Sequence, residues 1–320
     1  MSGIEIKSGG SRLKPEARTL KKAGRYLRKT WPLHVLLLPA VLIVIIYNYV
    51  PIAGGVIAFQ DYKPWLGIAA SPWVGLDNFR YLFSYPDGKQ VIINTLAIAT
   101  MKLTLHLIIP VVFALLLNEI RISWYKRTVQ TLVYLPHFLS WVILGGIFVD
   151  VLSVQGGIIN QFLGLFGVKP IFFLADGNWF RAVVVLSDIW KDFGFSAIIF
   201  LAAILGIDPS YYEAAEIDGA NRWQQMLKIT LPSVGPIFIV VATLSLGRVL
   251  DGGFDQIFNL YNPLVYSKGD IIDTFVYRVG LQGTQYSFAS AVGLFKSVIG
   301  FILIVISYRL AYKWAGYRIF

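Results

Sequence analysis

The stretch DPSYYEAAEIDGANRWQQMLKITLPSVGP, residues 208–236, is a short polar segment between two long apolar runs. Asp208 is a good N-cap, and the proline after it suits the first helical position, where its missing N–H costs nothing. We expect this helix to break at Gly219, a second helix to begin at Asn221, and Pro232 to end it. The predicted helix–turn–helix has small alanines on a surface face and is suited to lying in a groove of another protein.

The composition is that of a membrane protein with several spans. Of its 320 residues, 56% are hydrophobic and only 14% are charged, as in polytopic membrane proteins. The net charge is +10, and nine basic residues lie within residues 1–30. Just ahead of an apolar helix, such an arm favours a topology signal and contact with anionic lipid, so we expect a lipid bilayer and no nucleic acid as partner. The predicted domains are this basic cytoplasmic arm, 1–30, and a transmembrane domain, 31–320.

Six apolar runs are each close to the ~20 residues that cross a bilayer as a helix. The sequence therefore predicts an all-α membrane protein with six transmembrane helices. They are expected at about 33–58, 91–117, 129–151, 179–206, 234–251 and 291–313. No internal repeat relates the first three helices to the last three, so the chain is better interpreted as a subunit that needs a second, similar subunit beside it.

Positive charges indicate the orientation of these helices. With the amino end inside, the inner segments hold the nine residues of the arm and eight more Lys and Arg, whereas the outer segments hold six. This asymmetry predicts that the amino and carboxyl ends are both cytoplasmic. The polar segment 208–236 is then cytoplasmic too, and the chain is expected in a bacterial cytoplasmic (inner) membrane as a multi-pass protein.

The sequence contains no familiar catalytic motif. It has no G-x-x-x-x-G-K-[ST] phosphate-binding loop, no H-E-x-x-H and no G-x-S-x-G, so we do not expect the chain to be an enzyme or to hydrolyse ATP. There is no cysteine, which excludes disulfides and thiolate metal sites. His34, His106 and His137 fall in different helices and are interpreted as packed or hydrogen-bonded residues. No metal or cofactor is predicted in this chain.

Charged residues inside the expected spans are candidates for a substrate path, because a charge near the bilayer centre is costly unless it is paired or faces water. Asp188 and Asp192 share a helix face at i,i+4, and Lys191 can partly neutralise them. Arg248 and Asp251 form an i,i+3 pair in the fifth span. The candidate path residues are Lys102, Asp188, Trp190, Lys191, Asp192, Arg248, Asp251, Gln256 and Asn259.

Two interpretations of these residues stay open. In one, the charges are internal ion pairs that fix helix packing. In the other, the cations and Trp190 face a polar path, where aromatic faces stack on sugar rings and cations suit carboxylated sugars. The long polar excursion 252–289, which contains Gln256 and Asn259, is either a substrate-facing re-entrant element or a packed extracellular loop, because irregular backbone at membrane depth must line a cavity or be buried in protein.

The segment 208–236 also resembles a known signature. Its EAA-x-x-DGA string and the I-x-LP that follows are similar to the EAA motif of permeases of binding-protein-dependent type I ABC importers, with Met226 where an aromatic residue is common. NTLAIATMKL, YKRTVQTLVYLPHFLSWV and FDQIFNLYNP resemble the sugar-type members, closest to the branch for polysaccharides and acidic oligosaccharides such as aldouronates or alginate. The ATPase-coupling residues that this resemblance implies are Tyr212, Glu213, Ala214, Ala215, Asp218, Gly219, Ala220, Leu231 and Pro232.

The resemblance implies the type I ABC importer permease fold and a set of partners. These are a second homologous permease, two cytoplasmic ATPase subunits that hold ATP and Mg, an extracytoplasmic solute-binding protein and a saccharide substrate. The expected function is import of an oligosaccharide or polysaccharide, with the coupling helix in an ATPase cleft.

Three alternatives remain. The same architecture can carry a non-sugar solute, such as a phosphodiester or an amino acid. An ion-coupled secondary transporter would use Asp188, Lys191 and Asp192 as a proton relay and would be active as a single chain. An intramembrane enzyme would use the two carboxylates as acid and base.

Overall fold

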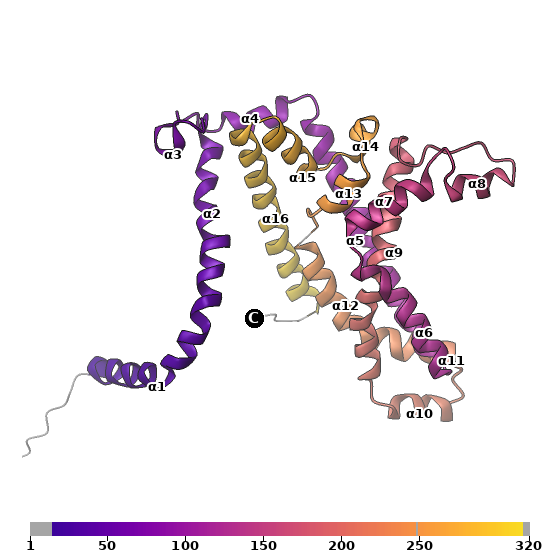
Figure 1. The fold of residues 1–320 in the computed structure, drawn as a ribbon. Coiled ribbons are helices and arrows are strands. Elements are labelled where there is room, and N and C mark those ends of the chain that lie inside the picture. Colours follow the sequence, from indigo (N-terminus) through magenta and orange to yellow (C-terminus); the bar gives the residue numbers. More distant parts are fainter. Residues whose placement is uncertain (1–14, 248, 316–320) are drawn as a thin grey trace, which may run out of the picture. The chain divides into compact units, whose positions relative to one another are not determined.

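The computed structural model describes residues 15–247 and 249–315, and within these ranges the chain is helical with no strand (Figure 1). Its only sheet-like feature there is an isolated bridge between Gln60 and Trp73. The chain divides into two compact units, Met1–Val56 and Ile57–Phe320. The predicted boundary near residue 30 stays a prediction.

The first unit is one interrupted helix. It comprises α1 (Pro15–Val44), a π-helical turn (Ile45–Tyr49) and α2 (Val50–Ala53). The π turn comes just before Pro51, whose missing N–H breaks the regular hydrogen-bond ladder. The apolar run Thr30–Phe59, which continues into a 3-10 turn (Gly54–Phe59), is long enough to cross a membrane, and none of its most apolar window is buried. Exposed apolar side chains are what a lipid-facing helix presents.

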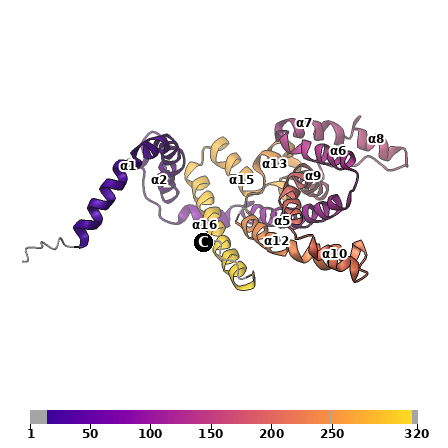
Figure 2. The same cartoon turned by 90° about the horizontal axis from the view of Figure 1, so that it is seen from below.

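Long helices form the frame of the second unit. Its central pair, α5 (Gly88–Glu119) and α9 (Gly177–Leu205), lie side by side (Figures 1 and 2). The last long helix, α16 (Tyr286–Ala315), packs against α12 (Leu231–Leu246) and α4 (Asp77–Ser84). Three buried apolar clusters stabilise this unit, one of them formed by α5, α9 and the start of α12.

One expected span is bent rather than straight, and another is followed by a sharp bend. The third consists of α6 (Ser123–Tyr134), a 3-10 turn (Leu135–Phe138) and α7 (Trp141–Leu152), and its two parts are bent by 103°. Pro136 lies in the 3-10 turn just before the break, where its missing N–H ends the α-helical hydrogen bonding of α6. The fourth expected span, 179–206, is the single helix α9, and α10 (Ser210–Ile217) follows it after a bend of 69°. By length and composition, the described chain has four straight candidate spans, or up to six with the bent pairs.

The fifth span differs from the prediction at both ends. Pro232 was expected to end a helix, but α11 (Arg222–Gln225), a π turn (Met226–Thr230) and α12 form one helical run, Arg222–Leu246. Pro232 lies in the first turn of α12, where a proline is tolerated, so it continues the run. The helix α12 ends at Leu246, so Asp251 lies outside the fifth span. The expectation that Asp251 pairs with Arg248 inside that span is therefore wrong. Arg248 itself lies outside the described residues.

The polar excursion 252–289 folds into short helices that pack within the second unit. These are α13 (Phe254–Leu260), a 3-10 turn (Pro263–Val265), α14 (Tyr266–Gly269), α15 (Ile272–Phe275) and a π turn (Val276–Gln282). Ile257, Ile271 and Phe275 have no exposed surface and belong to the apolar clusters. The excursion is therefore packed protein rather than a solvent-exposed loop.

The remaining connections carry three short helices. They are α3 (Gly67–Ala70), α8 (Ile158–Gly164) and α4, which begins with Asp77 in its first turn.

Close approach of α6 to α9 depends on Gly194, because a Cβ there would lie 2.6 Å from the carbonyl oxygen of Val133.

Candidate functional site

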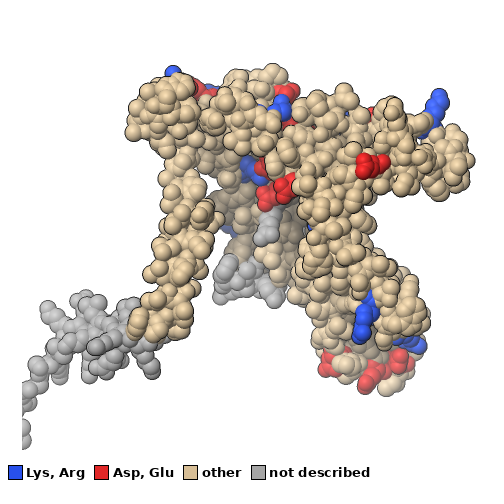
Figure 3. Space-filling model, viewed as in Figure 1, with Lys and Arg blue, Asp and Glu red and all other residues tan. Residues whose placement is uncertain are grey.

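The first candidate site is the surface segment around α10. No residue of α10 is buried, and the side chains of Tyr211 and Ile217 are 61% and 88% exposed. Figure 3 shows acidic residues gathered on this end of the molecule, where the sequence places Asp208, Glu213, Glu216 and Asp218. The helix α10 thus presents apolar and acidic side chains together on an exposed surface.

Capping interactions hold this segment in shape. The Asp208 carboxylate accepts the backbone N–H of Ser210 at 2.9 Å, which lowers the pKa of the Asp208 carboxyl. At the other end Gly219 adopts a positive φ of 77°, and the backbone N–H of Ala220 donates to the carbonyl of Ala215 at 2.8 Å. This is the six-to-one bond of a glycine-terminated helix. The predicted break at Gly219 is thus confirmed.

The second helix of the segment begins as predicted. Asn221 is its N-cap, and its side chain accepts the backbone N–H of Gln224 at 2.9 Å while the Gln224 side chain accepts the N–H of Asn221 at 2.8 Å. Both bonds together form a capping box. Arg222 pairs with Glu119 at 3.5 Å, so the segment is tied to the end of α5. The capped turns give α10 a defined surface before any partner arrives.

The second candidate site is a polar cavity of about 490 Å³ in the long-helix frame. Its charged and polar lining residues come from α5, α9, α12 and the segment after α12, and they are Lys102, His106, Asp188, Asp192, Ser245 and Asp251. Four of the predicted path residues are therefore brought together at one cavity. Gly253, also in its wall, has a φ of 87°.

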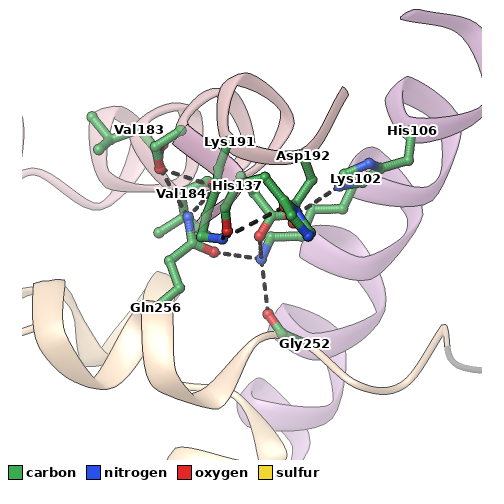
Figure 4. A network of polar contacts seen from close by, with 11 residues as sticks. Lys102, His106, His137, Val183, Val184, Lys191, Asp192, Gly252 and Gln256 are labelled. Atoms are coloured by element: carbon green, nitrogen blue, oxygen red, sulfur yellow. Dashed lines mark hydrogen bonds and ion pairs between the residues drawn. The ribbon is translucent and has the colours of Figure 1, made fainter. Parts of the chain in front are cut away.

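Lys102 is the centre of the buried network at this cavity (Figure 4). Its ammonium nitrogen lies 3.1 Å from Asp188 and donates to the carbonyl of Gly252 at 3.1 Å and to the side-chain oxygen of Gln256 at 2.5 Å. A Cβ at Gly253 would lie 2.8 Å from this nitrogen, so glycine permits the approach. One ammonium group thus joins α5, α9 and the segment that leads into α13.

Gln256 and His106 complete the coordination of this network. The Gln256 amide nitrogen donates to the Val184 carbonyl at 2.7 Å and to the Ser187 hydroxyl at 2.8 Å, and Gln256 is fully buried. Asp188 contacts the His106 ring at 2.9 Å through its second oxygen. Gln256 therefore holds the Lys102 ammonium in place from the protein interior and does not line the cavity.

A second group of polar contacts lies at the break in the third span (Figure 4). The Lys191 ammonium donates to the His137 carbonyl at 2.7 Å, and the His137 ring nitrogen lies 2.7 Å from Asp192. His137 also stacks on Phe195 with ring centroids 4.0 Å apart. A carbonyl freed by a helix break needs a donor when no water is present, and Lys191 supplies it.

The other candidate path residues are separate from the Lys102 network. Trp190 is 46% exposed and lines a different, apolar hollow with Phe148, its edge-on ring neighbour. The Asn259 amide donates to the Asp255 carbonyl one helical turn back. Asp251 faces the cavity but pairs with Lys296 at 3.0 Å, and Lys296 also pairs with Asp273 at 2.7 Å.

From the sequence, His106 and His137 were expected to be packed or hydrogen-bonded without a named partner, and Lys296 had no assigned role. His106 lies 82 positions from its partner Asp188, and His137 lies 55 positions from Asp192. Lys296 lies 45 and 23 positions from its two partners. Residue spacing within one helix therefore could not indicate these pairs. The expected packed or hydrogen-bonded state of His106 and His137 is confirmed. Asp188 pairs with Lys102 and His106, so charge compensation comes from another helix rather than from Lys191.

The described residues combine several membrane-length helices, a buried ionic network beside a polar cavity and an exposed capped helix. The chain belongs to the family described as the inner membrane component of binding-protein-dependent transport systems, which matches residues 106–316. It is accordingly a permease component in the inner membrane and not an enzyme; in ABC importers separate subunits hydrolyse ATP.

Similarity to characterised relatives extends over most of the chain. It is 44% identical over 282 residues to the polygalacturonan/rhamnogalacturonan transport system permease protein YteP of Bacillus subtilis, with 88% of each chain covered. Protein LplB of the same organism is 44% identical over 277 residues, with 87% of each covered. A bacterial ABC transporter involved in import of the acidic polysaccharide alginate has a chain with a TM-score of 0.86 and 36% identity, covering 92% of this chain and 99% of that one. The type I importer fold expected from the resemblance is confirmed.

Proposed function

We propose that this chain is one of two permease subunits of an ATP-driven importer of oligosaccharides or polysaccharides. The observation that supports it most is the 44% identity, over 88% of both chains, to a permease for polygalacturonan and rhamnogalacturonan. The matching alginate transporter has also been solved in complex with an alginate pentasaccharide-bound periplasmic protein. Acidic plant or algal polysaccharide fragments are therefore the first substrates to test.

The partners follow from this proposal. A second homologous permease completes the path, two cytoplasmic ATPase subunits hold ATP and Mg, and an extracytoplasmic solute-binding protein delivers the saccharide. Residues 208–236 couple the chain to one ATPase, with α10 and its exposed Glu213 and Ile217 as the docking surface. ATP-driven closure of the ATPases then shifts the population between inward-facing and outward-facing states.

The polar cavity is our proposed part of the substrate path. Of the two interpretations left open by the sequence, the contacts favour internal ion pairs for Lys102 and Lys191, because each is within 3.6 Å of a carboxylate, and Lys191 also donates to the His137 carbonyl. Asp188, Asp192 and Asp251 on the wall are each paired as well, but a carboxylate has lone pairs for further hydrogen bonds. The cavity is therefore suited to sugar hydroxyls, and Lys102 and Lys191 act as internal partners of carboxylates rather than as receptors for the acid groups of the sugar.

The test is purification of the tagged chain from its native membrane in mild detergent, followed by reconstitution of the co-purified complex. We expect a second permease and an ATPase to co-purify, and ATP-dependent uptake of oligogalacturonides or alginate oligosaccharides when the solute-binding protein is supplied. Galacto- and arabino-oligosaccharides test neutral sugars, and sn-glycerol-3-phosphate, transported by a 28% identical relative's system, tests a non-sugar solute. Uptake by the chain alone under an ion gradient would contradict the proposal and favour a secondary transporter.

A further inference from the structure

Among the residues that the structure describes, the helix α10 makes one side-chain hydrogen bond to a residue beyond itself and the turns that flank it. The hydroxyl groups of Tyr212 and Thr230 lie 2.9 Å apart. The Tyr212 side chain is half-buried, whereas Tyr211 beside it is 61% exposed and makes no such bond. No residue of α10 belongs to a buried apolar cluster. Among the described residues, this is therefore the one side-chain hydrogen bond that connects α10 to the packed helices of the second unit.

The receiving end of this bond is fixed in the core. Thr230 is 3% exposed and is the last residue of the π turn Met226–Thr230. Met226 and Val234, on either side of it, are 6% and 1% exposed and pack in one apolar cluster with residues of α5 and α9, such as Ala114 and Phe200. A displacement of Thr230 therefore acts on packed helices and not on a loose loop.

The covalent connections of α10 are turns rather than helices. At its start the chain bends by 69° from α9, and at its end Gly219 adopts a positive φ. Neither connection is a continuous hydrogen-bonded helix, which would carry force along its axis. The bond to Thr230 bypasses the second turn and reaches the fifth span directly.

The fifth span connects Thr230 to the polar cavity. Ser245 lines that cavity and lies fifteen residues beyond Thr230 in the same helical run, a distance of about 22 Å at 1.5 Å per residue. The π turn at Thr230 is a place where the helix ladder is already loosened, and such turns are common at functional sites.

We propose that the Tyr212–Thr230 hydrogen bond is the mechanical connection between α10 and the fifth span, so that movement of α10 repositions α12 beside the cavity. Tyr212 is then a positioning residue inside the permease rather than a contact with the ATPase. This inference rests on the proposed function, since it assumes that an ATPase moves α10.

The test measures uptake and ATP hydrolysis on the same reconstituted complex. Tyr212→Phe keeps the ring and removes the hydroxyl, and Thr230→Val keeps the shape of its partner. Each is expected to lower sugar transported per ATP hydrolysed by about five-fold or more, the lower end for coupling between sites, with the amount of co-purified ATPase unchanged. Tyr212→Phe combined with Thr230→Val should be no worse than either alone, because both remove the same bond.

Two control variants sharpen the result. Tyr125→Phe removes an exposed tyrosine hydroxyl on α6, outside α10 and the cavity, and should leave the ratio of transported sugar to hydrolysed ATP unchanged. Thr230→Ser keeps the hydroxyl and should retain most of that ratio. The inference is overturned if Tyr212→Phe transports with unchanged stoichiometry, if the two substitutions are additive, or if the ATPase no longer co-purifies with Tyr212→Phe, which would make Tyr212 a docking contact. Failure of the unmodified complex to contain an ATPase would instead overturn the proposed function.

Discussion

Removal of the Lys102 ammonium is the sharpest test of the buried network. Lys102→Met keeps most of the side-chain volume and removes the charge. The Lys102 and Asp188 side chains are 8% and 14% exposed, so this is a buried pair, and solvent screening does little to reduce its contribution. The substitution leaves the Asp188 carboxylate with His106 as its remaining partner and the Gln256 side-chain oxygen without its donor.

The expected magnitude follows from these losses. Removing one partner of a buried ion pair costs about 3–5 kcal/mol, because an uncompensated charge stays behind. An unpaired buried acceptor such as the Gln256 oxygen costs about 1–3 kcal/mol more. His106 stays at 2.9 Å from Asp188 as a hydrogen-bond partner of the carboxylate, which offsets part of this loss. We therefore expect the free energy of unfolding to fall by about 3–5 kcal/mol.

The assay is unfolding in mixed micelles by titration with a denaturing detergent, followed by tryptophan fluorescence. Lys89→Met is the matched control, because Lys89 lies exposed on the same helix and its loss should change the free energy by less than about 0.5 kcal/mol. Lys102→Met combined with Asp188→Leu removes both charges and should recover about 2 kcal/mol relative to additive behaviour. A loss below about 1 kcal/mol for Lys102→Met, or strict additivity in the double variant, would refute the buried-pair reasoning.

Gly219→Ala places a side chain at a positive φ of 77° and should lower uptake, whereas Gly219→Asn should keep more of it because Asn tolerates this conformation; equal uptake by both and by the unmodified complex would contradict this. Lys191→Met removes the donor to the His137 carbonyl and should lower the free energy of unfolding by about 1–3 kcal/mol, with Trp190→Phe as the control on the same helix. Glu213→Gln changes an exposed residue and should leave unfolding unchanged within about 0.5 kcal/mol while strongly reducing uptake; normal uptake would mean that Glu213 is not a docking contact.

The surface segment was predictable because its determinants are local. Asn221 as a cap and Gly219 as a break act within a few residues of themselves, and both appear in the structure. Pro232 was misinterpreted because a proline ends a helix or begins one depending on what precedes it. Here the π turn before it places Pro232 in the first turn of α12.

The buried network was only half predictable. Asp188 and Asp192 could be assigned to one region, since a charge inside an apolar run is visible in the sequence. Their partners could not be assigned, because His106 lies 82 positions from Asp188 and His137 lies 55 positions from Asp192. Such pairings are set by the packing of α5 and of the broken third span against α9.

The break in the third span has a consequence for how the protein is made. The His137 carbonyl receives its donor from Lys191, which is synthesised 54 residues later. Until α9 leaves the insertion machinery, the break between α6 and α7 has no such donor, and an unsatisfied carbonyl is costly in lipid. The third span is therefore expected to remain at the insertion site, or near water, until the fourth has emerged, so that the two enter the bilayer as one unit.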